Sequence, residues 1–288
     1  MKIQTFSVVV GGRKCNATCP YCVSKMTEGI SACSKSPDDI NVRNFRKACL
    51  FAKQSGVSTV LLTGVGEPLL YSSHIYKYLE LLREFEFPFI ELQTNGIDLH
   101  RFDGEYLKMW YDLGLTTVSL SVAHWRTREN REIFGENFVT LENNIEILHR
   151  NKLSVRISCV MLDGYIDSKD KILEMIQFCK DLRVEQLTCR PVGMPKDSKN
   201  EDIKHWAIQH LIDKDVEKDI DYHFNTNSNS TLLLKLAHGA KVYDYDGQNI
   251  SLNSCLTHSP NPDDIRQLIF ANDNHLRYSW EHKGAIIF

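Results

Sequence analysis

The chain has 288 residues, of which 42% are hydrophobic and 25% are charged, so it can bury a sizeable core and is not of the disordered class. Lys and Arg number 34 against 37 Asp and Glu, and this near balance argues against a nucleic-acid coat or an anionic-membrane surface as its role. No apolar run approaches the ~20 residues that span a bilayer, and residues 1–5 do not resemble a secretory leader, so we expect a cytoplasmic protein without nucleic-acid or membrane partners.

Apolar, β-rich runs alternate with segments of helical periodicity in the first two thirds of the chain. The strand-like runs are residues 6–10, 57–63, 89–94, 115–122, 153–162 and 184–191. The helix-like segments are residues 39–54, 72–84, 104–113, 137–150 and 168–181. Such alternation predicts parallel strands joined by crossover helices. The length has room for six units of about 30 residues, whereas a closed barrel needs about 250 residues, so we predict an α/β fold with a partial (β/α)6 TIM-type barrel over residues 1–195.

The pattern changes after residue 195, where a polar helical segment and several short apolar runs follow. The helix is expected at residues 201–214, and the short runs lie at 222–225, 231–236, 241–245, 250–256, 265–271 and 276–280. Turn signals such as Asp246-Gly247 and Asn261-Pro262 separate several of these runs. We therefore expect residues 196–288 to form a β-containing C-terminal extension that packs against the barrel opening and covers or shapes the substrate side.

The sharpest motif is a cysteine trio, Cys15, Cys19 and Cys22, which directly follows the first strand. The chain has nine cysteines, an odd number that argues against a closed disulfide framework. Three thiolates on one short loop can converge on one metal centre, and in a cubane cluster they leave one iron open to a small molecule. A zinc site remains the alternative, although zinc usually takes four ligands and the sequence offers no second pair or nearby histidine.

This spacing, C-x3-C-x-aromatic-C with Tyr21 in the aromatic position, resembles the motif of radical S-adenosylmethionine (SAM) enzymes. The resemblance implies that the three cysteines bind one [4Fe–4S] cluster and that SAM chelates its open iron. It further implies reductive cleavage of SAM to a 5′-deoxyadenosyl radical that abstracts hydrogen from substrate. An external one-electron donor, such as flavodoxin or ferredoxin, is also implied because no internal electron relay is visible.

Two further strand ends extend the resemblance. Gly64 and Gly66 precede Glu67 and Pro68 in a stretch similar to the family's Gly-Gly-Glu-Pro motif, whose backbone receives the SAM amino group; here Val65 separates the two glycines. Glycines at this place let backbone approach a ligand closely. Asn95, in the Thr-Asn-Gly end of the third strand, matches a family position near the active site, with an ordinary Asn-Gly turn as the alternative.

The last three strands supply the remaining candidates. Ser119 and Ser121 share one face of the fourth strand, and Ser121 best matches the family position for the SAM ribose or carboxylate. Arg156 on the fifth strand, if it points inward, needs an anion that SAM or the substrate can supply; the alternative is that it reaches solvent between the helices. The backbones of Arg190 and Val192 lie where the family places adenine.

The resemblance covers residues 6–193 and is nearest to the GTP-rearranging branch of molybdenum-cofactor biosynthesis. That branch has a second cluster motif in its tail, which this chain lacks, so GTP cyclisation is not carried over. We predict a radical SAM enzyme that acts on a small molecule, nucleotide-like or anionic. Peptide or protein modification, and a non-catalytic iron–sulfur or zinc regulator, remain alternatives. Cys189 and Cys255 are candidate hydrogen donors, with a plain packing role as the alternative.

Overall fold

The computed structural model describes residues 3–27, 36–195, 198, 200–236, 238–253, 265–282 and 284–288. Its strands are β1 Ile3–Val9, β2 Thr59–Thr63, β3 Phe89–Thr94, β4 Thr117–Val122, β5 Ser154–Met161, β6 Gln186–Pro191, β7 Ser230–Lys235, β8 Lys241–Tyr245, β9 Gln248–Leu252, β10 Ile265–Phe270 and β11 Leu276–Arg277. Its α-helices are α1 Val23–Met26, α2 Val42–Gln54, α3 Ser72–Leu82, α4 Glu105–Asp112, α5 Thr127–Phe134, α6 Leu141–Arg150, α7 Lys169–Asp181, α8 Glu201–Gln209 and α9 Lys214–Thr226. Short 3₁₀ turns lie at Pro37–Asp39, Pro68–Tyr71, Arg83–Phe85 and Leu99–Phe102.

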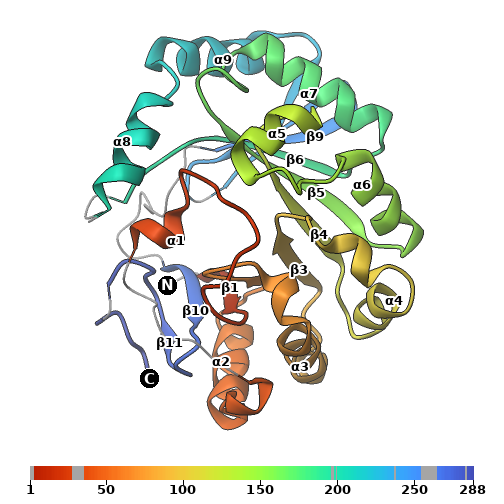
Figure 1. The fold of residues 1–288 in the computed structure, drawn as a ribbon, viewed down its shortest axis with the longest axis vertical. Helices are drawn as coiled ribbons and strands as arrows, with labels where there is room; N and C mark the ends of the chain where they lie inside the picture. The colour runs from red at the N-terminus through yellow and green to blue at the C-terminus, as the bar shows by residue number, and fades with distance from the viewer. Residues whose placement is uncertain are drawn as a thin grey trace.

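All of these strands belong to one curved sheet, with the order β11-β10-β1-β2-β3-β4-β5-β6-β9-β8-β7. Strands β1 to β6 are parallel and follow chain order, as in a partial TIM-type barrel. Helices α2, α3, α4, α6 and α7 lie around the outside of the sheet, and α1 and α8 lie at its open side (Figure 1). The predicted α/β class and partial barrel are confirmed.

The residues after 195 extend this sheet at both of its edges. Strand β9 pairs in parallel with β6, and β10 pairs in parallel with β1, so the tail strands flank the six barrel strands. An exposed edge strand leaves backbone groups unpaired, and these additions pair the edges of β1 and β6. The described tail strands therefore lengthen the barrel sheet itself, and the role of residues 196–288 on the substrate side stays a prediction.

Aromatic packing shows why the tail strand β10 belongs to the core. Phe45 of α2 is fully buried and contacts Phe6 of β1, Tyr78 of α3 and Phe270 of β10, with ring centroids 6.2, 5.0 and 5.1 Å away. Each buried aromatic ring contributes a large apolar area to the core. Strand β10 therefore seals the side of the core that β1 would otherwise expose.

In the described part of the tail, both helices differ from the prediction. Residues 222–225 were expected as a short apolar run between turns, but they lie inside helix α9, and the helix expected at 201–214 ends at Gln209. Ile220 and Phe224, four residues apart, are the buried positions of α9, which is helical spacing. The Asp213 side chain accepts from the Asp215 backbone N–H and caps the helix at its start.

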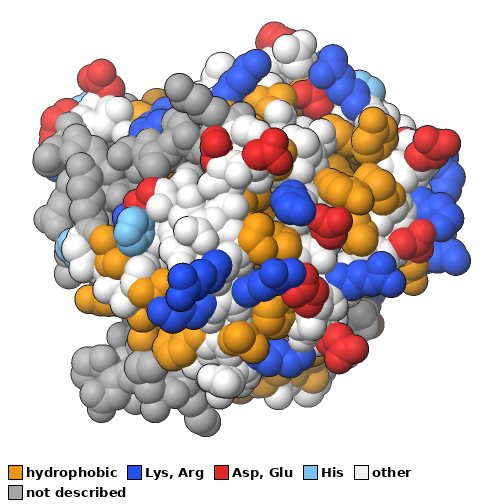
Figure 2. Space-filling model, turned by 90° about the horizontal axis from the view of Figure 1, so that it is seen from below, with side chains coloured by type: hydrophobic (Ala, Val, Ile, Leu, Met, Phe, Trp, Pro, Cys, Tyr) orange, Lys and Arg blue, Asp and Glu red, His pale blue; other side chains and the backbone are white. Residues whose placement is uncertain are grey.

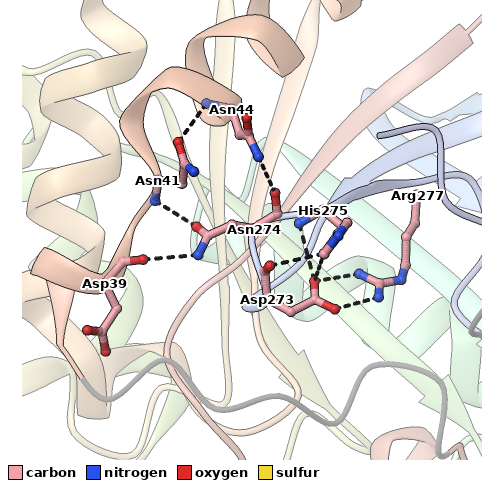
Figure 3. A network of polar contacts seen from close by, with 7 residues as sticks. All are labelled: Asp39, Asn41, Asn44, Asp273, Asn274, His275 and Arg277. Carbon is pink, nitrogen blue, oxygen red and sulfur yellow. Dashed lines mark hydrogen bonds and ion pairs between the residues drawn. The ribbon is translucent and has the colours of Figure 1, made fainter.

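The turn between β10 and β11 is fastened to the start of α2. The Asn274 side chain accepts from the Asn41 backbone N–H at 2.8 Å and donates to the Asp39 carbonyl at 3.0 Å, while its own carbonyl accepts from the Asn44 side chain at 3.2 Å (Figure 3). In the same turn Asp273 pairs with both terminal nitrogens of Arg277. These contacts fix the tail against the first barrel unit.

On the face seen in Figure 2, basic, acidic and hydrophobic side chains are interspersed. None of the helices in the described residues is long and apolar enough to cross a membrane.

Candidate active site

The three motif cysteines lie on the loop between β1 and α1, and all three are free thiols. They face one cavity of about 360 Å³. Burial, together with the neighbouring Cys22 and Cys15, raises the pKa of Cys19 to about 12. Three thiols that line one cavity suit a metal centre, because bound iron replaces the protons and neutralises the mutual repulsion of the thiolates.

The cavity lies at the carboxyl ends of the parallel strands, where α/β barrels place their active sites. Its walls include every predicted site residue except Arg156. These are Cys15, Cys19, Tyr21, Cys22, Gly64, Gly66, Glu67, Asn95, Ser121, Arg190 and Val192. The structure therefore brings together residues from the β1, β2, β3, β4 and β6 ends.

Gly66 explains how the β2 end fits beneath the cysteine loop. A Cβ atom on Gly66 would lie 2.3 Å from the Lys14 carbonyl oxygen and 2.5 Å from that of Gly12. The next residue, Glu67, donates its backbone N–H to the same Lys14 carbonyl at 3.0 Å. Only glycine permits this close approach of two backbones, so Gly66 has a structural role besides lining the cavity.

The Glu67 carboxylate is held by three donors. It accepts from the Leu69 backbone N–H at 2.9 Å, the Thr94 hydroxyl at 2.6 Å and the Asn95 backbone N–H at 3.0 Å. Burial raises the pKa of Glu67, and these donors offset part of that rise. A buried, oriented carboxylate of this kind can receive an ammonium group.

Apolar and aromatic side chains close the rest of the cavity. Phe134 and Val160 line it, and the Phe134 carbonyl accepts from the Thr18 backbone N–H at 3.1 Å, which ties α5 to the cysteine loop. Tyr21 is buried, and its ring packs on Trp206 of α8 at 6.0 Å between centroids. Sequence reasoning missed Phe134 and Trp206 because neither lies in a motif.

Arg156 does not line the cavity, and its guanidinium group already has an anionic partner within the protein. Its Nη2 pairs with Glu91 Oε1 at 2.5 Å, and its Nε donates to Ser119 at 3.3 Å. The Glu91 side chain is 8% exposed and that of Arg156 is 24% exposed, so this is a partly buried ion pair across β3, β4 and β5. The inward direction of Arg156 was predicted, but a protein carboxylate supplies the anion, which removes the reason for assigning Arg156 to SAM.

Arg190, unlike Arg156, has no anionic partner among the described residues. It lines the cavity from the β6 end, and its buried Nε has no hydrogen-bond acceptor among the described residues. Arg13 and Lys25 also line the cavity, and none of the three cations makes an ion pair within the described part of the chain. Glu67 is the carboxylate among the cavity-lining residues, so the wall carries unbalanced positive charge.

Among the described residues, the cysteines outside the motif do not line the cavity. Cys159 and Cys189 are buried, face each other across β5 and β6, and are absent from the cavity lining. The position of Cys189 therefore favours the packing role over hydrogen donation. Cys255 lies outside the described residues.

Comparison with known proteins places this site in context. A family model, the Radical SAM superfamily, matches residues 9–207. SuiB of Streptococcus suis bound to S-adenosylmethionine superposes with a TM-score of 0.60 at 15% identity, over 96% of this chain and 60% of SuiB. SuiB bound to its precursor peptide SuiA gives 0.59 at 14%, over 97% and 60%. The structure of anSMEcpe with bound AdoMet gives 0.51 at 17%, over 77% and 62%.

This chain thus spans about 60% of the length of SuiB, and at such identities the likeness shows a shared fold alone. No curated protein matches the sequence.

Proposed function

Because the chain belongs to the radical SAM superfamily, whose family model matches residues 9–207, we propose that it binds one [4Fe–4S] cluster and SAM in this cavity and acts on a small anionic molecule. The observation that carries the proposal is one cavity that joins three free thiols to the Gly64–Glu67 strand end. The nearest-branch assignment to molybdenum-cofactor biosynthesis gains no support from the comparisons and is not part of the proposal.

The residues present fit both groups. Cys15, Cys19 and Cys22 would hold the cluster as thiolates, leaving one iron open. The Glu67 carboxylate and the backbone beside Gly64 and Gly66 would receive the SAM amino group, and Ser121 would bind the ribose or carboxylate. When bound, the two groups supply reductive cleavage of SAM and a radical that abstracts hydrogen. Phe134, Val160 and Tyr21 keep water from that part of the cavity.

The charge of the wall supports an anionic substrate. A [4Fe–4S]²⁺ core on three thiolates carries one negative charge, and SAM carries one net positive charge, so the two cancel. The three positive charges of Arg13, Lys25 and Arg190 then exceed the one negative charge of Glu67. A partly buried cation without a partner is costly, and Arg190 is such a cation. We assign its guanidinium to a carboxylate or phosphate of the substrate, in addition to the proposed contact of the Arg190 and Val192 backbones with adenine.

Two further proposals concern the surroundings of the cavity. Residues 196–288 shape its substrate side, because Trp206 of α8 supports Tyr21 from outside. The electron comes from an external carrier such as a flavodoxin or ferredoxin, as in a cytoplasmic enzyme. The rival activity is peptide modification, which the likeness to SuiB with its precursor peptide favours.

Anaerobic reconstitution tests the cluster and SAM together. We expect about four irons and four sulfides per chain, and a change in the EPR spectrum of the reduced protein when SAM is added. Cys19→Ala should lose the SAM-responsive signal, whereas Cys49→Ala, which changes a buried thiol away from the cavity, should keep it. Zinc at one equivalent, or iron without SAM affinity, would favour a regulator instead.

The substrate class needs a separate test. Metabolite extracts are separated on an anion exchanger, and each fraction is assayed anaerobically for added 5′-deoxyadenosine. We expect the active fraction to be anionic and Arg190→Gln to reduce its effect at least about tenfold, with partial rescue by Arg190→Lys. A peptide fraction as the stimulant would transfer the assignment to peptide modification.

A further inference from the structure

The Asn95 side chain lies between the β3 end and the cysteine loop, and all of its polar atoms have partners. Its Nδ2 lies 3.9 Å from the Cys15 Sγ and 2.8 Å from the Asn16 Oδ1. Its Oδ1 accepts from the Ile97 backbone N–H at 2.9 Å. The residue is 7% exposed, so these contacts are shielded from bulk water. The Asn95 side-chain amide therefore donates one N–H to Asn16 and directs its second N–H toward the Cys15 sulfur.

Two independent contacts fix this amide orientation. The Asp98 carboxylate accepts from the Asn16 Nδ2 at 2.9 Å, and a carboxylate only accepts, so Asn16 must turn its oxygen toward Asn95. The Asn95 side chain must then present its NH₂ group to Asn16. On its other side, the Ile97 N–H requires the Asn95 oxygen, which gives the same orientation.

The Cys15 sulfur also has a second hydrogen-bond donor. Its Sγ accepts from the Ala17 backbone N–H at 3.4 Å. Hydrogen bonds to a thiolate ligand disperse its negative charge and stabilise the reduced, more negative form of an iron–sulfur cluster more than the oxidised form. Such bonds therefore raise the reduction potential.

We propose that the Asn95 amide is a positioning residue that sets the reduction potential of the cluster, through its N–H to the Cys15 sulfur. The proposal rests on the proposed function, because it requires a cluster on Cys15, Cys19 and Cys22. The backbone of Asn95 serves a different role, since its N–H donates to the Glu67 Oε2 at 3.0 Å. A side-chain substitution leaves that backbone bond to Glu67 in place and separates the two roles.

The test is an EPR-monitored redox titration of the reconstituted holoenzyme and of Asn95→Ala. We expect the variant to keep its iron content, while the equilibrium constant for one-electron reduction falls at least about threefold, a shift of about 28 mV to more negative potential. The matched control is Asn229→Ala, an exposed position away from the cavity, which should keep the original potential.

The outcomes distinguish a failure of this inference from a failure of the proposed function. Wild-type protein that assembles no cluster contradicts the proposed function, whereas a loaded Asn95→Ala with unchanged potential contradicts the role of Asn95 alone. If Asn95→Ala does not hold a full cluster, Asn95→Asp carries the test. It keeps the size and the acceptor for Ile97 but replaces the donor, so a potential equal to that of the wild type overturns the inference.

Discussion

The Asn272 side-chain amide donates to the Gly11 carbonyl, so a residue of the turn between β10 and β11 holds the start of the cysteine loop. The two residues are 261 positions apart in sequence, and Asn272 is buried. Asn274 of the same turn bonds to Asn41 and Asp39 just before α2 (Figure 3). The turn between β10 and β11 therefore contacts both the cysteine loop and the start of the first barrel helix.

This contact predicts that Asn272→Ala lowers the stability of the protein and loosens the attachment of the cysteine loop. Loss of the donor leaves a buried carbonyl without its partner, which costs about 1–3 kcal/mol. Chemical denaturation should show a free energy of unfolding lower by that amount, and the reconstituted variant should lose iron faster on dilution. Asn229→Ala, at an exposed asparagine, is the control. Equal iron retention in both variants would show that the Gly11 contact does not support the loop.

Gly66→Ala tests the close approach of the β2 end to the loop. The added methyl group would meet the carbonyl oxygens of Lys14 and Gly12 at 2.3 and 2.5 Å, and neither backbone can move without displacing Cys15. We expect the variant to fold but to bind less than half of the wild-type iron. Gly284→Ala, where the new methyl group meets nothing within 4 Å, should bind the full amount. Full cluster content in Gly66→Ala would contradict this account of the β2 end.

Glu67 predicts how SAM affinity depends on pH. Because burial raises its pKa above the ordinary value for a glutamate, the carboxylate gains a proton as pH falls, at a higher pH than an exposed glutamate would. The SAM ammonium then loses its anionic partner, so the dissociation constant should increase toward acidic pH. Equilibrium binding between pH 5 and 8 measures this, and Glu67→Gln should bind weakly with little pH dependence. An acid-side change that persists in Glu67→Gln would assign the effect to another group.

The Arg156–Glu91 pair predicts a loss of stability rather than of ligand affinity. Arg156→Gln leaves the buried Glu91 carboxylate without its cation. Breaking a fully buried pair costs about 3–5 kcal/mol, and the loss here should be smaller because Arg156 is 24% exposed and Gln93 still donates to Glu91. SAM affinity should stay within about twofold of wild type. Arg46→Gln, which breaks an exposed pair with Glu84, should leave stability nearly unchanged. A tenfold loss of SAM affinity in Arg156→Gln would return this residue to the SAM site.

The sequence predicted the local features of the molecule well. Strand β3 and strand β8 lie where the apolar runs indicated, and the cavity contains the three cysteines with Glu67 and Asn95. These features depend on neighbours in the chain, such as a motif spacing or a hydrophobic period.

The features that were missed depend on distant pairs. The anion of Arg156 is Glu91 on β3, which no local pattern connects to β5, because the pairing register of strands is set by the fold. The parallel pairing of β10 with β1 joins the two ends of the chain in the same way. Helix α9 was missed for another reason: residues 222–225 were read alone, without Val216 and Ile220, which complete the helical period.

The most direct test of the central claim is SAM cleavage by the reconstituted protein. The anaerobic protein is reduced with dithionite in the presence of SAM, and 5′-deoxyadenosine and methionine are measured by mass spectrometry, with Cys22→Ala as the paired variant. The account predicts 5′-deoxyadenosine and methionine in equal amounts from the wild type and neither from Cys22→Ala. A wild-type protein that holds four irons and binds SAM, yet forms no 5′-deoxyadenosine above the Cys22→Ala level, would contradict it.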